Sequence, residues 1–202
     1  IKKETFYNLT LNDTCTVDND LNFVTMHDSV SVRDTLALID GVLNLNTNVF
    51  TIINSLSSAI IGGSDTTFIK SETTPIAGYG FVDWKIGANA GIYRYPFGKS
   101  GFFKSGEYIP VTFNITTTGD VSGAISVATY STVVNNLPLP TGVNNVDRNG
   151  VNNSSNTVDR FWIINSSYTL APMVTFTLTT TTSELDAVTV PQAQRWNSAT
   201  SL

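Results

Sequence analysis

Few side chains of this sequence could carry out catalysis. His27 is the only histidine and Cys15 the only cysteine. Because a tetrahedral Cys/His metal centre needs about four such ligands, a site of that kind is excluded. No Gly-x-Ser-x-Gly nucleophile motif occurs, and the segment "MHDS" around His27 offers no further catalytic signal. We interpret His27 as an exposed turn residue and Cys15 as a small core residue, and we predict that the protein is not an enzyme.

Carboxylates are the second group of side chains with potential chemistry. Asp18-Asn19-Asp20 is the densest acidic cluster, but it lacks the ligand spacing of an EF-hand loop. Calcium at this cluster is the one cofactor that the sequence leaves open, and no other metal or cofactor is expected. A glycosidase needs two facing carboxylates, and the sequence alone reveals no such pair.

Aromatic residues are concentrated in one stretch of the sequence. They include Tyr79, Trp84, Tyr93, Tyr95, Phe102, Phe103 and Tyr108. Exposed rings on a β-sheet face can stack on sugars, whereas buried rings fill a core, which is the commoner arrangement. If the protein has a carbohydrate-binding surface, Tyr93, Tyr95 and Phe103 are the candidates for it.

The composition excludes several classes of partner. Charged residues make up only 13% of the chain, its net charge is −5, and its pI is near 4.6. Binding to duplex nucleic acid requires clustered Lys and Arg, and the 11 present here are scattered, so no nucleic-acid partner is expected. No apolar run is long enough to span a membrane. The polar surface must come from Asn, Thr, Ser and Gly, which is typical of all-β proteins with many turns.

Short alternating segments recur along the first third of the sequence. Their apolar pairs at i and i+2 are Leu9/Leu11, Cys15/Val17, Leu21/Phe23, Val30/Val32, Leu36/Leu38, Leu43/Leu45 and Phe50/Ile52. Every third pair lies about 21 residues further on, as from Leu9 to Val30 and then to Phe50. This spacing predicts a short parallel β-helix over residues 1–73, with three strands per coil of about 21 residues. An antiparallel meander is the alternative.

Longer alternating runs begin after a break near residue 74. They cover residues 80–86, 91–96, 109–116, 123–131, 159–165, 173–182 and 185–196. Strands of this length, separated by turn-rich loops, predict an antiparallel β-sandwich over residues 74–202. In the segment "VDRFWII", Trp162 is expected to fill the core, and Arg160 is expected to need a partner or an exit to solvent.

Several segments of the second half together resemble a known module. They are "FVDWKIGANAGIYRYPFGKSG" with "GEYIPVTFNIT", then "VDRFWIINSSY" with "VTFTLTTTTSEL", and finally "AQRWNSAT". In order and spacing they resemble the β-sandwich module near the ends of large secreted and surface proteins of Bacteroidota. In those proteins the module often follows β-helical coils of the "LNLNTNVFTI" kind. The resemblance covers roughly three quarters of the chain, and it implies export by the type IX route and display outside the cell.

The same group of bacteria attaches O-linked glycans to Asp-Ser/Thr followed by an aliphatic residue or Thr. The matching segments are Asp28-Ser29-Val30, Asp34-Thr35-Leu36 and Asp65-Thr66-Thr67. Each falls at an expected corner or loop, where a transferase could reach the hydroxyl group of Ser29, Thr35 or Thr66. The alternative is that Asp-Thr and Asp-Ser simply favour turns.

These observations favour a structural role. We expect a non-enzymatic, structural or adhesive segment of a large extracellular bacterial surface protein. Its expected partners are other domains of the same long chain, neighbouring copies, or glycans. The alternative function is a carbohydrate-binding module appended to a secreted polysaccharide-degrading enzyme.

Overall fold

The chain folds almost entirely into β-strands. The structure, a computed structural model, describes residues 4–13, 23–73, 78–100, 106–185 and 196. The all-β class is confirmed, because the described part contains no helix of seven residues or more. Its strands are β1 (Glu4–Phe6), β2 (Leu9–Asn12), β3 (Phe23–Thr25), β4 (Val30–Val32), β5 (Leu36–Asn44), β6 (Val49–Ile52), β7 (Ile60–Gly62), β8 (Thr67–Lys70), β9 (Phe81–Trp84), β10 (Gly91–Tyr95), β11 (Gly98–Ser100), β12 (Gly106–Tyr108), β13 (Val111–Thr117), β14 (Ile125–Ser131), β15 (Asp147–Arg148), β16 (Val151–Asn152), β17 (Arg160–Ser166) and β18 (Met173–Leu178). Short 3-10 helices cover Ser154–Asn156 and Thr182–Glu184.

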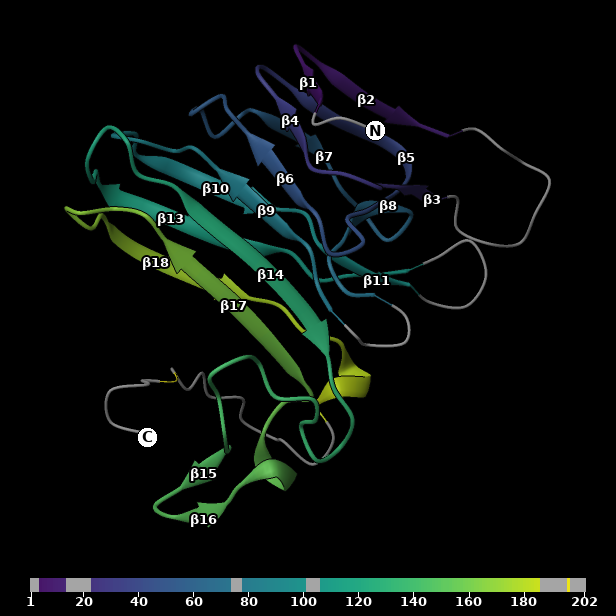
Figure 1. Ribbon diagram of the computed structural model, residues 1–202, viewed down its shortest axis with the longest axis vertical. Helices are drawn as coiled ribbons and strands as arrows, with labels where there is room; N and C mark the ends of the chain where they lie inside the picture. Colours follow the sequence, from purple (N-terminus) through teal and green to yellow (C-terminus); the bar gives the residue numbers. More distant parts are fainter. Residues whose placement is uncertain (1–3, 14–22, 74–77, 101–105, 186–195, 197–202) are drawn as a thin grey trace. The chain divides into compact units, whose positions relative to one another are not determined.

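The N-terminal strands pair in parallel along three ladders. One ladder runs β1-β4-β6-β9, a second runs β2-β5-β7, and a third runs β3-β5-β8. Strand β5 contributes to two ladders because the chain bends within it at Gly41, whose φ of +89° favours glycine. We call a stretch of chain that passes once through all three ladders a coil, so β4 and β5 together belong to the second coil. Figure 1 shows β1, β4 and β6 side by side and running in the same direction.

The predicted strand pairing is right for Val30 and wrong for Leu9. Val30 pairs with Phe50 as expected, whereas Leu9 pairs with Leu36 and not with Val30. Val30 instead pairs with Glu4, in a strand that the apolar pairs did not mark. The even spacing also fails later, because Phe50 pairs with Val82. Corners of different length separate the strands, so a fixed repeat cannot locate them all. Cys15 and Leu21 lie outside the described residues.

Side chains at equivalent positions of successive coils form columns inside the stack. Val32, Ile52 and Trp84 are in register along the first ladder, and all three are fully buried. Neighbouring residues in register point to the same side of a sheet, so each column adds apolar contacts from coil to coil. This core continues without interruption into the C-terminal strands, as far as Val127.

The first ladder changes from parallel to antiparallel pairing at β9. Strand β9 pairs in parallel with β6 on one side and antiparallel with β14 on the other, and β17 follows β14. A second antiparallel sheet has the order β10-β13-β18. The predicted boundary near residue 74 lies outside the described residues, so that division stays a prediction. Strands on both sides of it belong to one six-stranded sheet.

Contacts divide the chain into two compact units. The first comprises residues 1–129 and 162–179, and the second comprises residues 130–161 and 180–202. Within the second unit the Arg160 guanidinium binds the Glu184 carboxylate through two hydrogen bonds of 2.8 and 2.7 Å, and both side chains are buried. The expectation that Arg160 needs a partner is therefore confirmed. Trp162, expected in the core, is half-buried and packs against the core cluster of the first unit.

Candidate functional site

The three hydroxyl groups predicted to carry glycans lie on three different corners of the coils. Ser29 precedes β4, Thr35 precedes β5, and Thr66 precedes β8. Ser29 is half-buried, and its Oγ accepts a hydrogen bond of 3.2 Å from the backbone N–H of Val49 in the next coil. Thr35 is also half-buried, whereas Thr66 is exposed. Of the three, Thr66 is the hydroxyl that an enzyme could reach without opening the corner.

The aspartates of these segments have structural contacts. Asp28 Oδ1 accepts the N–H of Ser29, and Asp34 Oδ1 accepts a hydrogen bond from Asn54 in the next coil. Asp65 Oδ1 accepts the backbone N–H of Tyr108 at 2.9 Å, which ties the β11–β12 hairpin to the coil. Asp28 therefore makes a local turn contact, whereas Asp34 and Asp65 bind residues far away in the sequence.

Two of the three aromatic residues proposed for sugar binding are in the core. Tyr93 and Tyr95 have no exposed surface, so the placement of their rings on an outer sheet face is wrong. Both rings pack edge-to-face on Trp84, with centroid distances of 5.1 and 5.4 Å. Their hydroxyl groups donate hydrogen bonds to the carbonyls of Ser55 (2.9 Å) and Ile125 (2.8 Å). Phe103 lies outside the described residues.

Burial also determines the acid–base behaviour of these tyrosines. It raises the pKa of the Tyr95 phenol well above its usual value, and it raises that of Tyr93 in the same direction. Desolvation disfavours the phenolate, so both groups stay neutral hydrogen-bond donors over the physiological range. Their role is to satisfy buried carbonyls while filling the space between the sheets.

A loop contact that the sequence analysis missed lies in the first unit. The Asp120 carboxylate accepts five hydrogen bonds, from the N–H and hydroxyl groups of Ser122 and Thr169 and from the N–H of Leu170. These bonds, led by that of Leu170, hold the pKa of Asp120 well below its usual value. The sequence marks a turn at "TTGDVSG", which contains Asp120. It does not reveal that the loop of Thr169 and Leu170 lies next to that turn.

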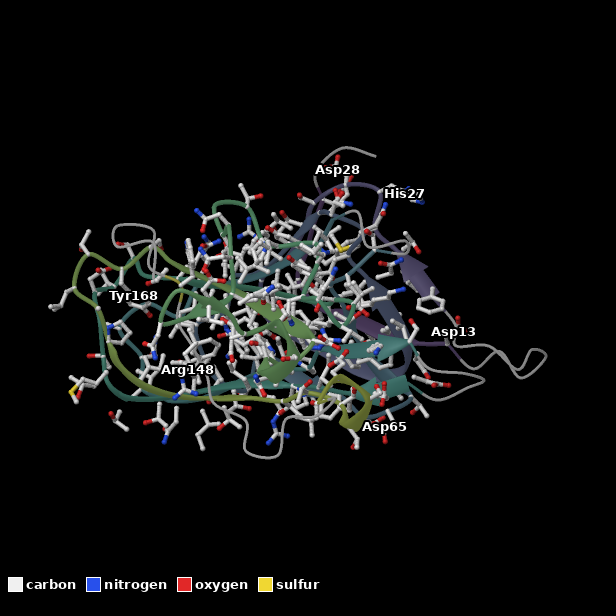
Figure 2. All side chains as sticks on the ribbon, turned by 90° about the horizontal axis from the view of Figure 1, so that it is seen from below. Asp13, His27, Asp28, Asp65, Arg148 and Tyr168 are labelled. Atoms are coloured by element: carbon white, nitrogen blue, oxygen red, sulfur yellow. The ribbon has the colours of Figure 1, made fainter. Side chains whose placement is uncertain are left out.

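Tyr168 reinforces the same loop contact. A Cβ on Gly123 would lie 1.9 Å from the Tyr168 ring, so only glycine allows this close approach. The hydroxyl of Tyr168 donates a hydrogen bond of 2.8 Å to the carbonyl of Gly87. Burial raises the pKa of this phenol to about 12. Figure 2 labels Tyr168, which lies far from His27 and Asp28.

The described residues offer little for catalysis or metal binding. His27 is exposed on the turn that follows β3, next to Asp28 (Figure 2). Within the described ranges, no three His, Cys, Asp or Glu side chains are grouped so that they could hold a metal ion. The calcium candidate Asp18-Asn19-Asp20 lies outside those ranges. An open depression in the second unit is lined by Val133, Val134, Asn135, Asn152, Ser154 and Ser155, none of which is an acid or a base.

Comparisons with known proteins found no matching family model, no matching curated protein and no matching solved structure. No helix in the part of the chain that the structure describes is long and apolar enough to cross a membrane.

Proposed function

We propose that this protein is a non-enzymatic structural segment of a large extracellular bacterial surface protein. In this proposal the N-terminal strands form a short parallel β-helix, and the C-terminal strands form a β-sandwich built on its last coil. The segment would extend or anchor a longer chain. Support comes from the three parallel ladders and from the core that continues into the antiparallel strands. The resemblance to Bacteroidota surface modules suggests the setting, with type IX export.

The observation that carries the proposal is the first coil, whose described inward-facing side chains are exposed along two of the three ladders. Phe6 occupies the same column as the buried Val32, yet 42% of its surface is exposed. Val24 occupies the same column as the buried Leu43 and is 46% exposed. On the third side Leu11 is already buried, so the opening lies along β1 and β3. These are positions that another coil would cover.

Strand polarity identifies the kind of coil that fits. Among the described residues, β1 pairs only with β4, and both β2 and β3 pair only with β5, so one edge of each strand is unpaired. A further coil of the same chain would pair with these edges in parallel, as the coils below do. A second copy that met this end through its own first coil would pair in the antiparallel sense. We therefore assign the open end to another coil of the same polypeptide.

A fusion protein tests this assignment. A copy of residues 26–48, which contain β4 and β5, is joined ahead of Ile1. We expect the backbone amides of β1 and β3 to exchange with solvent about tenfold more slowly in the fusion than in the original chain. The control fusion carries serine in place of the copied Val32, Leu36 and Leu43, which removes its inward apolar side chains. It should give no protection.

Two outcomes would overturn the assignment. One is that the fusion leaves exchange in β1 and β3 unchanged. The other is that the original chain is a dimer in solution, by light scattering, and that Phe6→Ser and Val24→Ser make it monomeric. In the second case the open end belongs to a neighbouring copy.

Glycan attachment is proposed at Thr66, with Ser29 and Thr35 as the less accessible candidates. Mass spectrometry of the protein purified from a Bacteroidota host tests this directly. We expect a glycan that is lost in Thr66→Ala and retained in Thr35→Ala. An unmodified Thr66 in that host would contradict the proposal.

The alternative function is carbohydrate binding. Tyr93 and Tyr95 are buried, so of its three candidate rings only Phe103 remains a candidate for stacking on a sugar.

A further inference from the structure

A two-residue turn in the second unit has an unusual combination of sequence and exposure. It joins β15 to β16, and Arg148, labelled in Figure 2, pairs with Val151 across it. The two turn residues, Asn149 and Gly150, have φ values of +55° and +78° and are both exposed. Positive φ at both positions is the type I′ turn that favours Asn-Gly. This is the only Asn-Gly pair among the 202 residues.

The side-chain amide of Asn149 and the backbone N–H of Gly150 make no hydrogen bonds within the described residues. A Cβ added to Gly150 would meet nothing within 4 Å. Glycine also has no side chain of its own to shield its nitrogen. The backbone nitrogen of Gly150 and the amide carbon of Asn149 can therefore approach each other.

We propose that Asn149 is a site of spontaneous deamidation. The deprotonated backbone nitrogen of Gly150 attacks Cγ of Asn149, a C–N bond forms, and the side-chain nitrogen leaves as ammonia. Water then opens the resulting five-membered succinimide at either carbonyl, which yields aspartate or isoaspartate. The balance is one water consumed and one ammonia released, with no change of oxidation state. The reaction accelerates as pH rises, because the attacking nitrogen must first lose its proton.

Asn54, by contrast, is protected by its contacts. Asn54 precedes the small residue Ser55, but its Nδ2 donates hydrogen bonds to the carbonyl and the carboxylate of Asp34. Its Oδ1 accepts the N–H of Leu56 at 3.1 Å. This side chain cannot turn toward the backbone nitrogen of Ser55 without losing those bonds. Asn54 therefore serves as an internal control in the same molecule.

The reaction would alter the hairpin in which it occurs. Isoaspartate adds one carbon to the main chain within a turn whose two residues set the Arg148–Val151 register. Either product adds a negative charge to a chain whose net charge is −5. Strands β15 and β16 have two residues each and, in the described part, pair only with each other, so little holds the hairpin in place.

Peptide mass spectrometry during incubation in mildly alkaline buffer tests the proposal. The folded protein and the same chain unfolded in denaturant are sampled in parallel. We expect Asn149 to convert in the folded protein at a rate within about tenfold of the rate in the unfolded chain. Asn54 should convert in the unfolded chain only. The acidic species should be absent in Asn149→Gln and present in Asn54→Gln.

Protection of Asn149 by the fold would overturn the proposal. That result would be an intact Asn149 in the folded protein under conditions that convert it in the unfolded chain. A conversion rate in the folded protein that does not rise with pH would also overturn it, because the succinimide route requires a deprotonated nitrogen.

Discussion

At the scale of single residues, the contacts of a side chain decide what it does. Tyr93 and Tyr95 alternate as expected for a strand, but the face they occupy is buried, so their hydroxyl groups serve backbone carbonyls. Arg160 has a buried carboxylate partner, Glu184, which is 24 residues away in the sequence. Burying one charge without the other would be costly, which explains why the two are found together.

Asp120 is the residue for which we predict a pH-dependent effect. Its folded-state pKa lies below the usual 3.8, so its contribution to stability is fully present above pH 3.8. That contribution is lost as the pH falls through the lower, folded-state pKa. We expect Asp120→Asn to lower the free energy of unfolding at neutral pH. The difference from the original protein should shrink in strong acid, as measured by denaturant unfolding at a series of pH values.

A second variant refines the Asp120 test. Thr169→Ala removes the hydroxyl donor but keeps the backbone donors of Thr169 and Leu170. It should reproduce the effect in part, with the same pH dependence. An Asp120→Asn effect that is independent of pH would show that the carboxylate charge is not what these donors stabilise.

At the scale of the elements, asparagine side chains join one coil to the next at the corners. Asn48 Nδ2 donates to the carbonyls of Met26, Leu45 and Asn46, each at 3.1 Å. Asn46 also reaches the Met26 carbonyl, and Asn54 reaches Asp34. These bonds satisfy carbonyl groups where the chain leaves its ladder. The abundance of asparagine in the sequence thus has a structural use in the corners.

The loss of one such corner contact should be measurable. We expect Asn48→Ala to lower the free energy of unfolding by about 1–3 kcal/mol, because several half-buried carbonyls lose a donor. Asn12→Ala is the matched control, since Asn12 is exposed on β2. It should change stability by less than about 0.5 kcal/mol. Denaturant unfolding monitors both variants, and equal effects would contradict the role of the corner contact.

At the scale of the molecule, the parallel and antiparallel parts of the first unit share one sheet and one core. Strand β9 pairs with β6 of the coils and with β14 of the antiparallel part. The buried cluster contains Leu11 as well as Val127. Elements that share this much buried surface are expected to unfold cooperatively.

We therefore predict that the first unit unfolds in a single transition. Ile52→Ala, at a fully buried position of β6, should destabilise the unit by about 2–5 kcal/mol. Hydrogen exchange should report the same loss in β4 and in the distant β13. The neighbouring Ile53 is 42% exposed, and Ile53→Ala should change exchange in neither strand. If Ile52→Ala accelerated exchange in β4 alone, the coils would be a separate folding unit.

The sequence alone determined the all-β class, the alternation along the strands and the places where turns fall, because these depend on neighbouring residues. Only the tertiary structure decided that Leu9 pairs with Leu36, that Tyr93 and Tyr95 face inward, and that Arg160 meets Glu184. Alternation shows that two side chains share a face, but not whether another sheet covers it. Pairing partners depend on corner lengths and on contacts between residues far apart in the sequence, which no local pattern contains.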